Sequence, residues 1–365
     1  MKQNSNQQAF IALVKAGLWN EEVRLLPYRA IDFKEVLRIA EEQTVIGLLA
    51  VGIERVDGFR VPQADVLTIA GRALQIEQQN IAMNQFVAEL FAKLQTEKIN
   101  AVLVKGQGVA QCYERPMWRS CGDVDLLLNE KDYQEAKFFL LPQATSVETE
   151  YSTFKHVGMQ FDGFEVELHG CLHTRLSKKI DFYLDTLQNE MFREKRYRVW
   201  NNGGEAINIP APEYDVLFVF THILHHYYVE GIGLRQICDW CRLLWAYRND
   251  IEHELLKYRL FAMGIETEWK AFAALAVDYL GMPEDAMPFY SPEKRWSHKA
   301  DKIMAFILKT GNFGHNRQQN HNKAQSVLRK LKDFGRHSLV FPVDSIKFFF
   351  HFVCDGLVLT TNKEK

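Results

Sequence analysis

Two aspartates separated by a single residue are the strongest chemical signal in this chain. Asp123 and Asp125 begin the run Gly122-Asp123-Val124-Asp125-Leu126-Leu127-Leu128, which starts polar and ends apolar. In an extended strand, side chains at i and i+2 point to one face about 6.6 Å apart, while Val124 points to the core. Like charges repel at a strand end, but their hard oxygens bind divalent cations. The spacing therefore predicts a metal site at a sheet edge.

The flanking sequence supplies further groups suited to metals and phosphates. Val102-Leu103-Val104 is a short apolar run ending at Lys105-Gly106, which predicts a buried strand followed by a tight turn. A short helix from Gln107 to Tyr113 would begin at that turn, where its free N–H groups suit phosphate oxygens. A third carboxylate is expected from Glu167, which would complete a site for two ions about 3.5–4 Å apart.

In this order, the motifs resemble those of the nucleotidyltransferase superfamily with the DNA polymerase β-like palm, and more narrowly a bacterial family of uncharacterised nucleotidyltransferases. The matching motifs are Lys105-Gly106, Tyr113, Arg119, Gly122-Asp123-Val124-Asp125 and Val166-Glu167-Leu168-His169. The family's Glu-Leu-His pattern selects Glu167 over Glu165 as the metal ligand. The wider superfamily has Gly-Ser where this chain has Gly106-Gln107, so a hydroxyl contact to the triphosphate is not assumed.

The resemblance implies transfer of a nucleoside monophosphate from an NTP to an unidentified acceptor, a small molecule, sugar or protein, with release of pyrophosphate. The implied catalytic residues are also the ligands of two Mg²⁺ ions, for which Mn²⁺ can substitute: Asp123, Asp125 and Glu167. Glu167 is also a possible general base toward the acceptor. The residues expected to contact substrate are Lys105, Gly106, Arg119, Gly122, His169 and His226. Lys105 and Arg119 would stabilise charge on the pyrophosphate, or alternatively only neutralise the aspartates.

Two other kinds of function stay open at this stage. The first is a catalytically inactive protein of the same fold that binds nucleotide or serves as a scaffold. The second is a helical interaction module stabilised by zinc, because His222, His225 and His226 share a helix face and Cys238-Asp239-Trp240-Cys241 follows. The strongly apolar helical pattern around both groups favours ordinary core residues. Within the same segment, Arg235 and Asp239 are predicted to form an i,i+4 ion pair.

The N-terminal part of the chain has the pattern of a helical bundle. Asp32 is a predicted N-cap for a helix that runs to about Val56. Pro62 suits the first turn of a long helix that ends near Lys98. The apolar stripe expected along this long helix consists of Leu67, Ala70, Leu74, Ile81, Phe86, Leu90 and Leu94.

The middle of the chain alternates between predicted strands and helices. A helix is expected at 131–139 and another at 181–191. Asp162-Gly163 predicts a two-residue hairpin turn between Phe154–Phe161 and Phe164–His169, and 201–204 predicts a second hairpin. The predicted fold class is α+β, with a small polymerase β-like palm between helical regions. The expected division is a helical region at 1–98, the palm at 99–211 and a helical domain at 212–365.

Composition constrains the partners and the cellular compartment. The chain has 365 residues, 47% hydrophobic and 25% charged, with a formal charge of −2, which argues against general nucleic-acid binding. The N-terminus lacks the pattern of a secretory signal, and no apolar run is long enough to span a membrane. Six dispersed cysteines are typical of reduced thiols, so a cytoplasmic location is expected. The sequence does not predict an oligomeric state.

Overall fold

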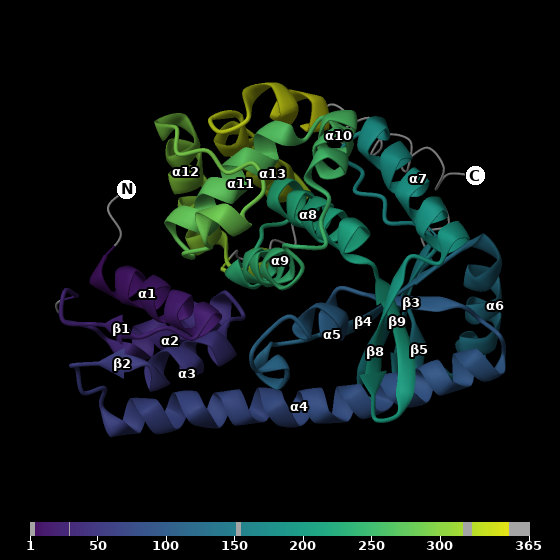
Figure 1. The fold of residues 1–365 in the computed structure, drawn as a ribbon, viewed down its shortest axis with the longest axis horizontal. Helices are drawn as coiled ribbons and strands as arrows, with labels where there is room; N and C mark the ends of the chain where they lie inside the picture. Colours follow the sequence, from purple (N-terminus) through teal and green to yellow (C-terminus); the bar gives the residue numbers. More distant parts are fainter. Residues whose placement is uncertain (1–3, 29, 151–154, 317–322, 350–365) are drawn as a thin grey trace.

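The computed structural model describes residues 4–28, 30–150, 155–316 and 323–349 of the chain, and it has the α+β architecture that was expected. A small mixed sheet lies among helices, with helical regions before and after it in the sequence (Figure 1). The N-terminal elements are α1 (Ser5–Trp19), β1 (Val23–Arg24), α2 (Phe33–Glu42), α3 (Ile46–Glu54), β2 (Val56–Asp57) and α4 (Gln63–Thr96).

The predicted helix from Asp32 to about Val56 is two helices rather than one. Asp32 does cap α2, because its carboxylate accepts hydrogen bonds from the backbone N–H groups of Lys34 and Glu35. The chain then breaks at 43–45, where Thr44 has a left-handed backbone with φ of 54°. The break turns α3 onto α1, so the sequence expectation of one continuous helix is wrong at this point.

Helix α4 runs along one side of the molecule from α1–α3 to the strands, and Pro62 is its N-cap (Figure 1). Leu90 and Leu94 of the predicted stripe are buried, but Leu67, Leu74 and Ile81 are exposed. The buried positions are Ile69, Ala73, Asn80, Met83, Val87, Leu90, Phe91 and Leu94. Along its length α4 contacts α2 and α3, then the short helix η1 (Pro116–Trp118), then the strands β8 (Tyr197–Asn202) and β9 (Glu205–Pro210), so its buried face is set by several different partners.

The sheet has five strands in the order β3-β4-β7-β6-β5. Its elements, with the intervening helices, are β3 (Ala101–Val104), α5 (Gly106–Ala110), β4 (Asp123–Leu128), α6 (Glu130–Leu140), η2 (Leu141–Gln143), β5 (Ser146–Val147), β6 (His156–Phe161) and β7 (Phe164–His169). β4 and β7 are parallel and the other neighbours are antiparallel. The predicted Asp162-Gly163 hairpin is present, with β6 beginning at His156, and Phe154 lies outside the described residues.

Strand alternation divides the sheet into a packed face and a face that carries the polar motif. Val124, Leu126 and Leu128 belong to a core cluster with α4 and α6. Asp123, Asp125 and Leu127 point the other way, and Leu127 joins a second, larger core cluster. The motif therefore lies on the sheet face opposite α4 and α6.

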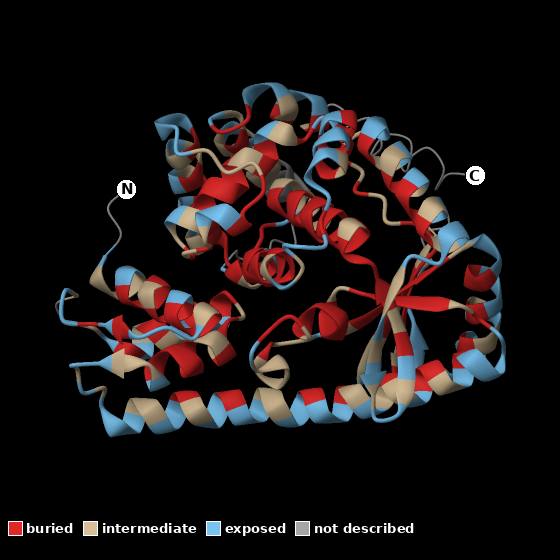
Figure 2. Ribbon diagram, viewed as in Figure 1, coloured by how far each residue is buried: buried red, intermediate tan, exposed pale blue. Residues whose placement is uncertain are grey.

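Helices cover this second face of the sheet. After the sheet come α7 (Lys178–Glu194), the hairpin of β8 (Tyr197–Asn202) and β9 (Glu205–Pro210), α8 (Pro212–Val229), α9 (Leu234–Ala246), α10 (His253–Met263), α11 (Glu266–Asp278), η4 (Glu284–Ala286), α12 (Lys294–Thr310), η5 (Asn312–Gly314) and α13 (Lys323–Ser338). Figure 2 shows that α8 and α9 are largely buried. Among the described residues, no helix has the length and apolar character needed to cross a membrane.

Candidate metal and substrate site

Strand register brings the two aspartates and Glu167 into one group. Asp125 lies opposite Glu167 on the parallel neighbour β7, and Asp123 lies opposite Glu165. One oxygen from each of Asp123, Asp125 and Glu167 lies within 4.8 Å of the others. Glu165 does not belong to this group, although it points to the same face. The carboxylate that the structure groups with both aspartates is therefore Glu167.

The three carboxylates differ in what surrounds them. Asp125 is almost fully buried, and its Oδ1 accepts a hydrogen bond from Lys105 Nζ at 2.8 Å and lies 2.8 Å from His169 Nε2. Burial opposes its ionisation, but Lys105 and His169 outweigh burial and hold the pKa of Asp125 below its usual value. The charge of Asp125, together with burial, raises the pKa of Asp123. This repulsion between neighbours is the kind that a bound cation relieves.

The turn after β3 delivers Lys105 to this group. Lys105 has φ of 57° and Gly106 has φ of 33°, a left-handed conformation that a lysine rarely adopts. The turn ends β3 and starts α5, and it directs the Lys105 side chain to Asp125. Gly122 shows no comparable requirement, because a Cβ at that position would meet no atom within 4 Å among the described residues beyond its chain neighbours.

Arg119 and Arg235 both line the large cavity described below, but Arg119, not Arg235, is the partner of Asp239. Arg119 donates from Nη2 to Asp239 Oδ2 at 2.6 Å and from Nε to Asp239 Oδ1 at 3.1 Å, and all of these atoms are buried. Arg235 instead donates from Nη1 to the Ser120 carbonyl at 2.7 Å. The predicted Arg235–Asp239 pair is therefore wrong, because Asp239 is taken by an arginine 120 residues away.

A cavity of about 590 Å³ opens between the motif-bearing sheet face and α8 and α9. Lys105, Asp123, Asp125, Glu167 and His169 lie at its sheet side. The helix side contributes His222, His225, His226, Arg235 and Asp239. The cavity therefore joins an acidic wall to a wall of histidines and arginines, in a volume suited to a nucleotide-sized molecule.

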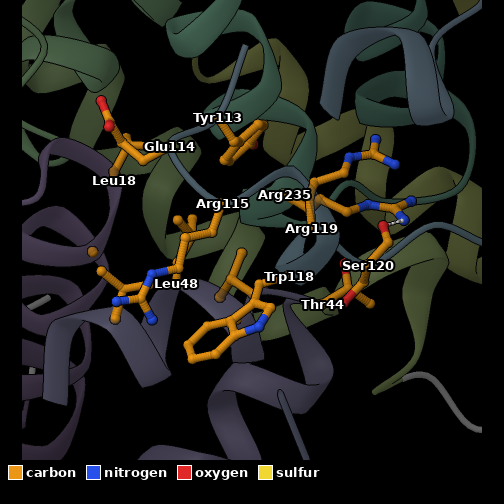
Figure 3. Close-up of a pocket in the computed structure, with 14 residues that line it drawn as sticks. Leu18, Thr44, Leu48, Tyr113, Glu114, Arg115, Trp118, Arg119, Ser120 and Arg235 are labelled. Carbon is orange, nitrogen blue, oxygen red and sulfur yellow. Dashed lines mark hydrogen bonds between the residues drawn. The ribbon is translucent and has the colours of Figure 1, made fainter. Parts of the chain in front are cut away.

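A second, much smaller cavity of about 20 Å³ lies against the N-terminal helices. Figure 3 shows Arg115 and Trp118 in its wall, together with Arg119, Arg235 and the Arg235–Ser120 hydrogen bond. This cavity is too small to hold more than about one water molecule. Arg119 and Arg235 also line the large cavity. Arg119 and Arg235 therefore lie between the two cavities.

The histidines of α8 are separate from the Cys238–Cys241 pair. His225 Nδ1 lies 2.7 Å from the Thr174 carbonyl, and His226 Nδ1 lies 3.2 Å from Glu230 Oε2. Burial, reinforced by Lys105, holds the pKa of His222 well below its usual value. Cys238 and Cys241 are buried in α9, and the metal-capable groups found among the described residues include neither them nor these histidines. The described part of the chain thus provides no assembled zinc site of the kind considered from the sequence.

Arg235 and His156 are two residues of this cavity that the sequence did not assign to a metal or substrate site. Arg235 was assigned to an intrahelical pair, and no local signal indicated otherwise. His156 had a usable signal, because a two-residue turn at Asp162-Gly163 fixes the pairing of the hairpin and places His156 directly opposite His169.

The donor set matches the needs of hard divalent cations. Three carboxylates converge on a cavity wall, one of them with its pKa raised by a like charge. Mg²⁺ binds through one or two carboxylates, water and substrate phosphates, which such a wall beside an open cavity can provide. The residues present therefore fit Mg²⁺ or Mn²⁺.

Comparison with known proteins gives the family. Residues 29–281 match the family described as Uncharacterised nucleotidyltransferase. Because this match covers well over half of the chain, the protein belongs to that family. The expected family is thereby confirmed, and so is the α+β fold with its small mixed sheet among helices.

Other comparisons add little detail. A solved structure titled as an antigenic nucleotidyltransferase-like protein from Paracoccidioides brasiliensis is similar at 14% identity and a TM-score of 0.33. That similarity covers 55% of this chain and 92% of the other. No curated protein matches the chain.

Proposed function

We propose that this protein transfers a nucleoside monophosphate from an NTP to an acceptor and releases pyrophosphate. The observation that carries the proposal is the group of Asp123, Asp125 and Glu167 on one wall of a cavity that also holds Lys105 and Arg235. Membership in the nucleotidyltransferase family supports the same reaction class. The base of the NTP and the acceptor are left open.

In this proposal, Asp123, Asp125 and Glu167 hold the divalent ions, which supply charge neutralisation of the triphosphate and activation of the acceptor. Glu167 serves as a ligand rather than as a proton acceptor. Burial alone would raise the pKa of Glu167, but hydrogen bonds from His156 and His169 outweigh burial and lower it. A lowered pKa weakens a carboxylate as a general base and keeps it ionised, as a metal ligand must be.

Two cations are assigned to the phosphate groups. Lys105 is within hydrogen-bonding distance of Asp125 and lines the cavity, so it can move between the carboxylate and a bound phosphate. Arg235 replaces Arg119 as the proposed bidentate phosphate donor, because Asp239 already occupies the guanidinium of Arg119. Arg235 is partly buried beside the Arg119 guanidinium, and its Nε has no hydrogen-bond partner among the residues that the structure describes. A phosphate would supply the missing counter-charge.

The test is thermal stabilisation by ATP, GTP, CTP and UTP, each with and without Mg²⁺, on wild type, Asp123→Asn and Glu165→Gln. Asp123 is preferred to Asp125 because Asp125 holds Lys105 and lies next to His169 in the core. Glu165→Gln is the matched control, since it removes one negative charge from the same sheet face, opposite Asp123. We expect a Mg²⁺-dependent shift in wild type and the control, and its loss in Asp123→Asn.

Two results would change the assignment. An unchanged shift in Asp123→Asn would remove the acidic group from nucleotide binding. A normal shift without pyrophosphate release, when the NTP is incubated with cell extract as a source of acceptors, would favour an inactive nucleotide-binding protein of the same fold.

A further inference from the structure

Two imidazole rings converge on the same carboxylate oxygen beside the acidic group. His156 Nε2 lies 3.1 Å from Glu167 Oε2, and His169 Nε2 lies 3.2 Å from that same oxygen. The three side chains form a second metal-capable group, distinct from the three carboxylates and sharing only Glu167 with them.

The sheet fixes this arrangement rigidly. His156 and His169 are directly opposed in the β6–β7 ladder, and Glu167 lies two residues before His169 on the same face. Gly158 is the partner of Glu167 on β6, and the Glu148 side chain lies over it, with its carboxylate 3.1 Å from where a Cβ of residue 158 would stand. Sites built on paired strands keep their donor atoms in place better than sites on loops.

The group is also accessible from the cavity. The side chains of His156 and Glu167 are about a quarter exposed, and His169 is less exposed. All three line the 590 Å³ cavity. An ion entering the cavity can therefore reach them without any movement of the fold.

The ligand atoms of His156, Glu167 and His169 differ in type from those of Asp123 and Asp125. Mg²⁺ prefers oxygen ligands, whereas imidazole suits zinc, iron and the other divalent transition metals. Two ligands bound to one tetrahedral ion at about 2.0–2.1 Å lie roughly 3.3 Å apart, close to the separations observed here. Two histidines and one carboxylate also form a known catalytic zinc set that keeps one position open.

We propose that His156, Glu167 and His169 bind one divalent transition-metal ion, of the Zn²⁺ or Co²⁺ class, next to the oxygen-only site of Asp123 and Asp125. The two positions are then chemically unequal, and Glu167 is the ligand that they share. This inference stands on the geometry of the three side chains and does not depend on nucleotidyl transfer.

Hydrogen bonding alone is the competing explanation for the cluster. His169 Nε2 faces Asp125 Oδ1 at 2.8 Å as well as Glu167 Oε2, yet one ring nitrogen carries at most one proton. His156 faces the same Glu167 oxygen. An ion among these atoms would accept lone pairs from several of them at once. Hydrogen bonds alone would leave at least one of the three close N···O contacts without a proton of its own.

The experiment measures metal binding directly, with no nucleotide present. Metal-free protein is titrated with Co²⁺ to follow its visible absorption, and bound Zn²⁺ is counted by elemental analysis after dialysis, with excess Mg²⁺ present. The variants are His156→Gln and a matched control, His173→Gln. His173 also lines the cavity and lies 2.8 Å from Asp185 Oδ1, but it belongs to neither metal-capable group.

We expect about one Zn²⁺ per chain and a Co²⁺ spectrum with nitrogen ligation in wild type and His173→Gln, with affinity at least about tenfold weaker in His156→Gln. Melting temperatures of the metal-free variants establish that each is folded. Failure of wild type to retain Zn²⁺, its displacement by Mg²⁺, or unchanged binding in His156→Gln would each overturn the proposal. Because these readouts are independent of NTP, they separate this site from the proposed reaction.

Discussion

At the residue scale, two arginines that line the cavity, Arg119 and Arg235, have different expected roles, the first in stability and the second in substrate binding. Arg119 is locked to Asp239, which also accepts a hydrogen bond from the Tyr113 hydroxyl at 2.7 Å. Arg235 has one backbone acceptor, and burial together with the nearby Arg119 charge lowers its pKa. Arg119 is therefore expected to stabilise the fold, whereas the charge of Arg235 is expected to contribute little to stability.

We expect Arg119→Gln to lower the free energy of unfolding by about 3–5 kcal/mol, because it leaves the Asp239 carboxylate buried without its cation. Arg235→Gln should change that free energy by less than about 1 kcal/mol, since a lost hydrogen bond is offset by relief of repulsion. It should nevertheless abolish the Mg²⁺–NTP thermal shift. Urea unfolding and thermal shifts on both variants check this, and the opposite pattern would exchange the two roles.

The buried carboxyl group of Glu268 is expected to make the stability of the protein depend on pH. It is fully buried, Tyr228 donates a hydrogen bond to its Oε1 at 3.2 Å, and burial raises its pKa from 4.5 to about 8. The folded protein thus binds more protons than the unfolded chain between these values, so stability falls as pH rises from about 4.5 to 8 and levels off above.

Glu268→Gln should remove this slope and be more stable than wild type at pH 9 by about 2–4 kcal/mol. The two proteins should differ least at the acid end of the range, because the glutamate of the unfolded chain also becomes protonated as pH falls toward and below 4.5. Urea-unfolding free energies measured from pH 5 to 9 test this. Parallel pH profiles for the two proteins would mean that Glu268 is not the group responsible.

At the scale of elements, glycines let α1 and α3 approach closely. A Cβ at Gly52 would lie 2.1 Å from the Leu13 carbonyl oxygen, and one at Gly17 would lie 2.0 Å from that of Leu48. The contact joins the backbones of the two helices directly, so neither position tolerates a methyl group without separating them.

Gly52→Ala is expected to destabilise the protein by about 1–3 kcal/mol, despite the better helix propensity of alanine. Gly71→Ala is the control, because Gly71 also lies within a helix, but apart from that helix's own backbone no atom of the described residues lies within 4 Å of the added methyl group. That change should stabilise by about 0.5–1 kcal/mol. Equal effects in urea unfolding would show that close packing at Gly52 is unimportant.

Some elements could be predicted from the sequence, whereas others could not. The Asp162-Gly163 hairpin, the strand at Asp123–Leu128 and the Asp32 cap follow from local chemistry, and the structure has all three. The buried face of α4 did not follow, because Leu67 and Leu74 are apolar yet face away from the partners that the folded chain supplies. The Arg119–Asp239 pair was not predicted for a similar reason. An i,i+4 spacing does not show whether a residue on another element will pair with Asp239 instead.

At the scale of the molecule, the two ends of the chain share one core. A single cluster contains Leu13 and Val36 from the N-terminal helices, Val104 from the sheet, and Trp240 and Trp269 from the C-terminal helices. Arg242 on α9 donates to the Leu18 carbonyl at 3.1 Å and to the Cys112 carbonyl at 2.8 Å. The proposed regions 1–98 and 212–365 are thus adjacent in space, while the α4–α6 face of the sheet has a core cluster of its own.

This arrangement predicts that α1 unfolds together with α11, although α6 is closer to α1 in sequence. Hydrogen exchange measured by mass spectrometry across a urea series should show α1 and α11 losing protection over the same range, because their side chains belong to one cluster. Arg242→Met should shift both to lower urea, whereas Arg248→Met, at an exposed position, should shift neither. Loss of protection in α1 well before α11 would instead mean that 1–98 is an independent unit, and that the shared core contributes little cooperativity.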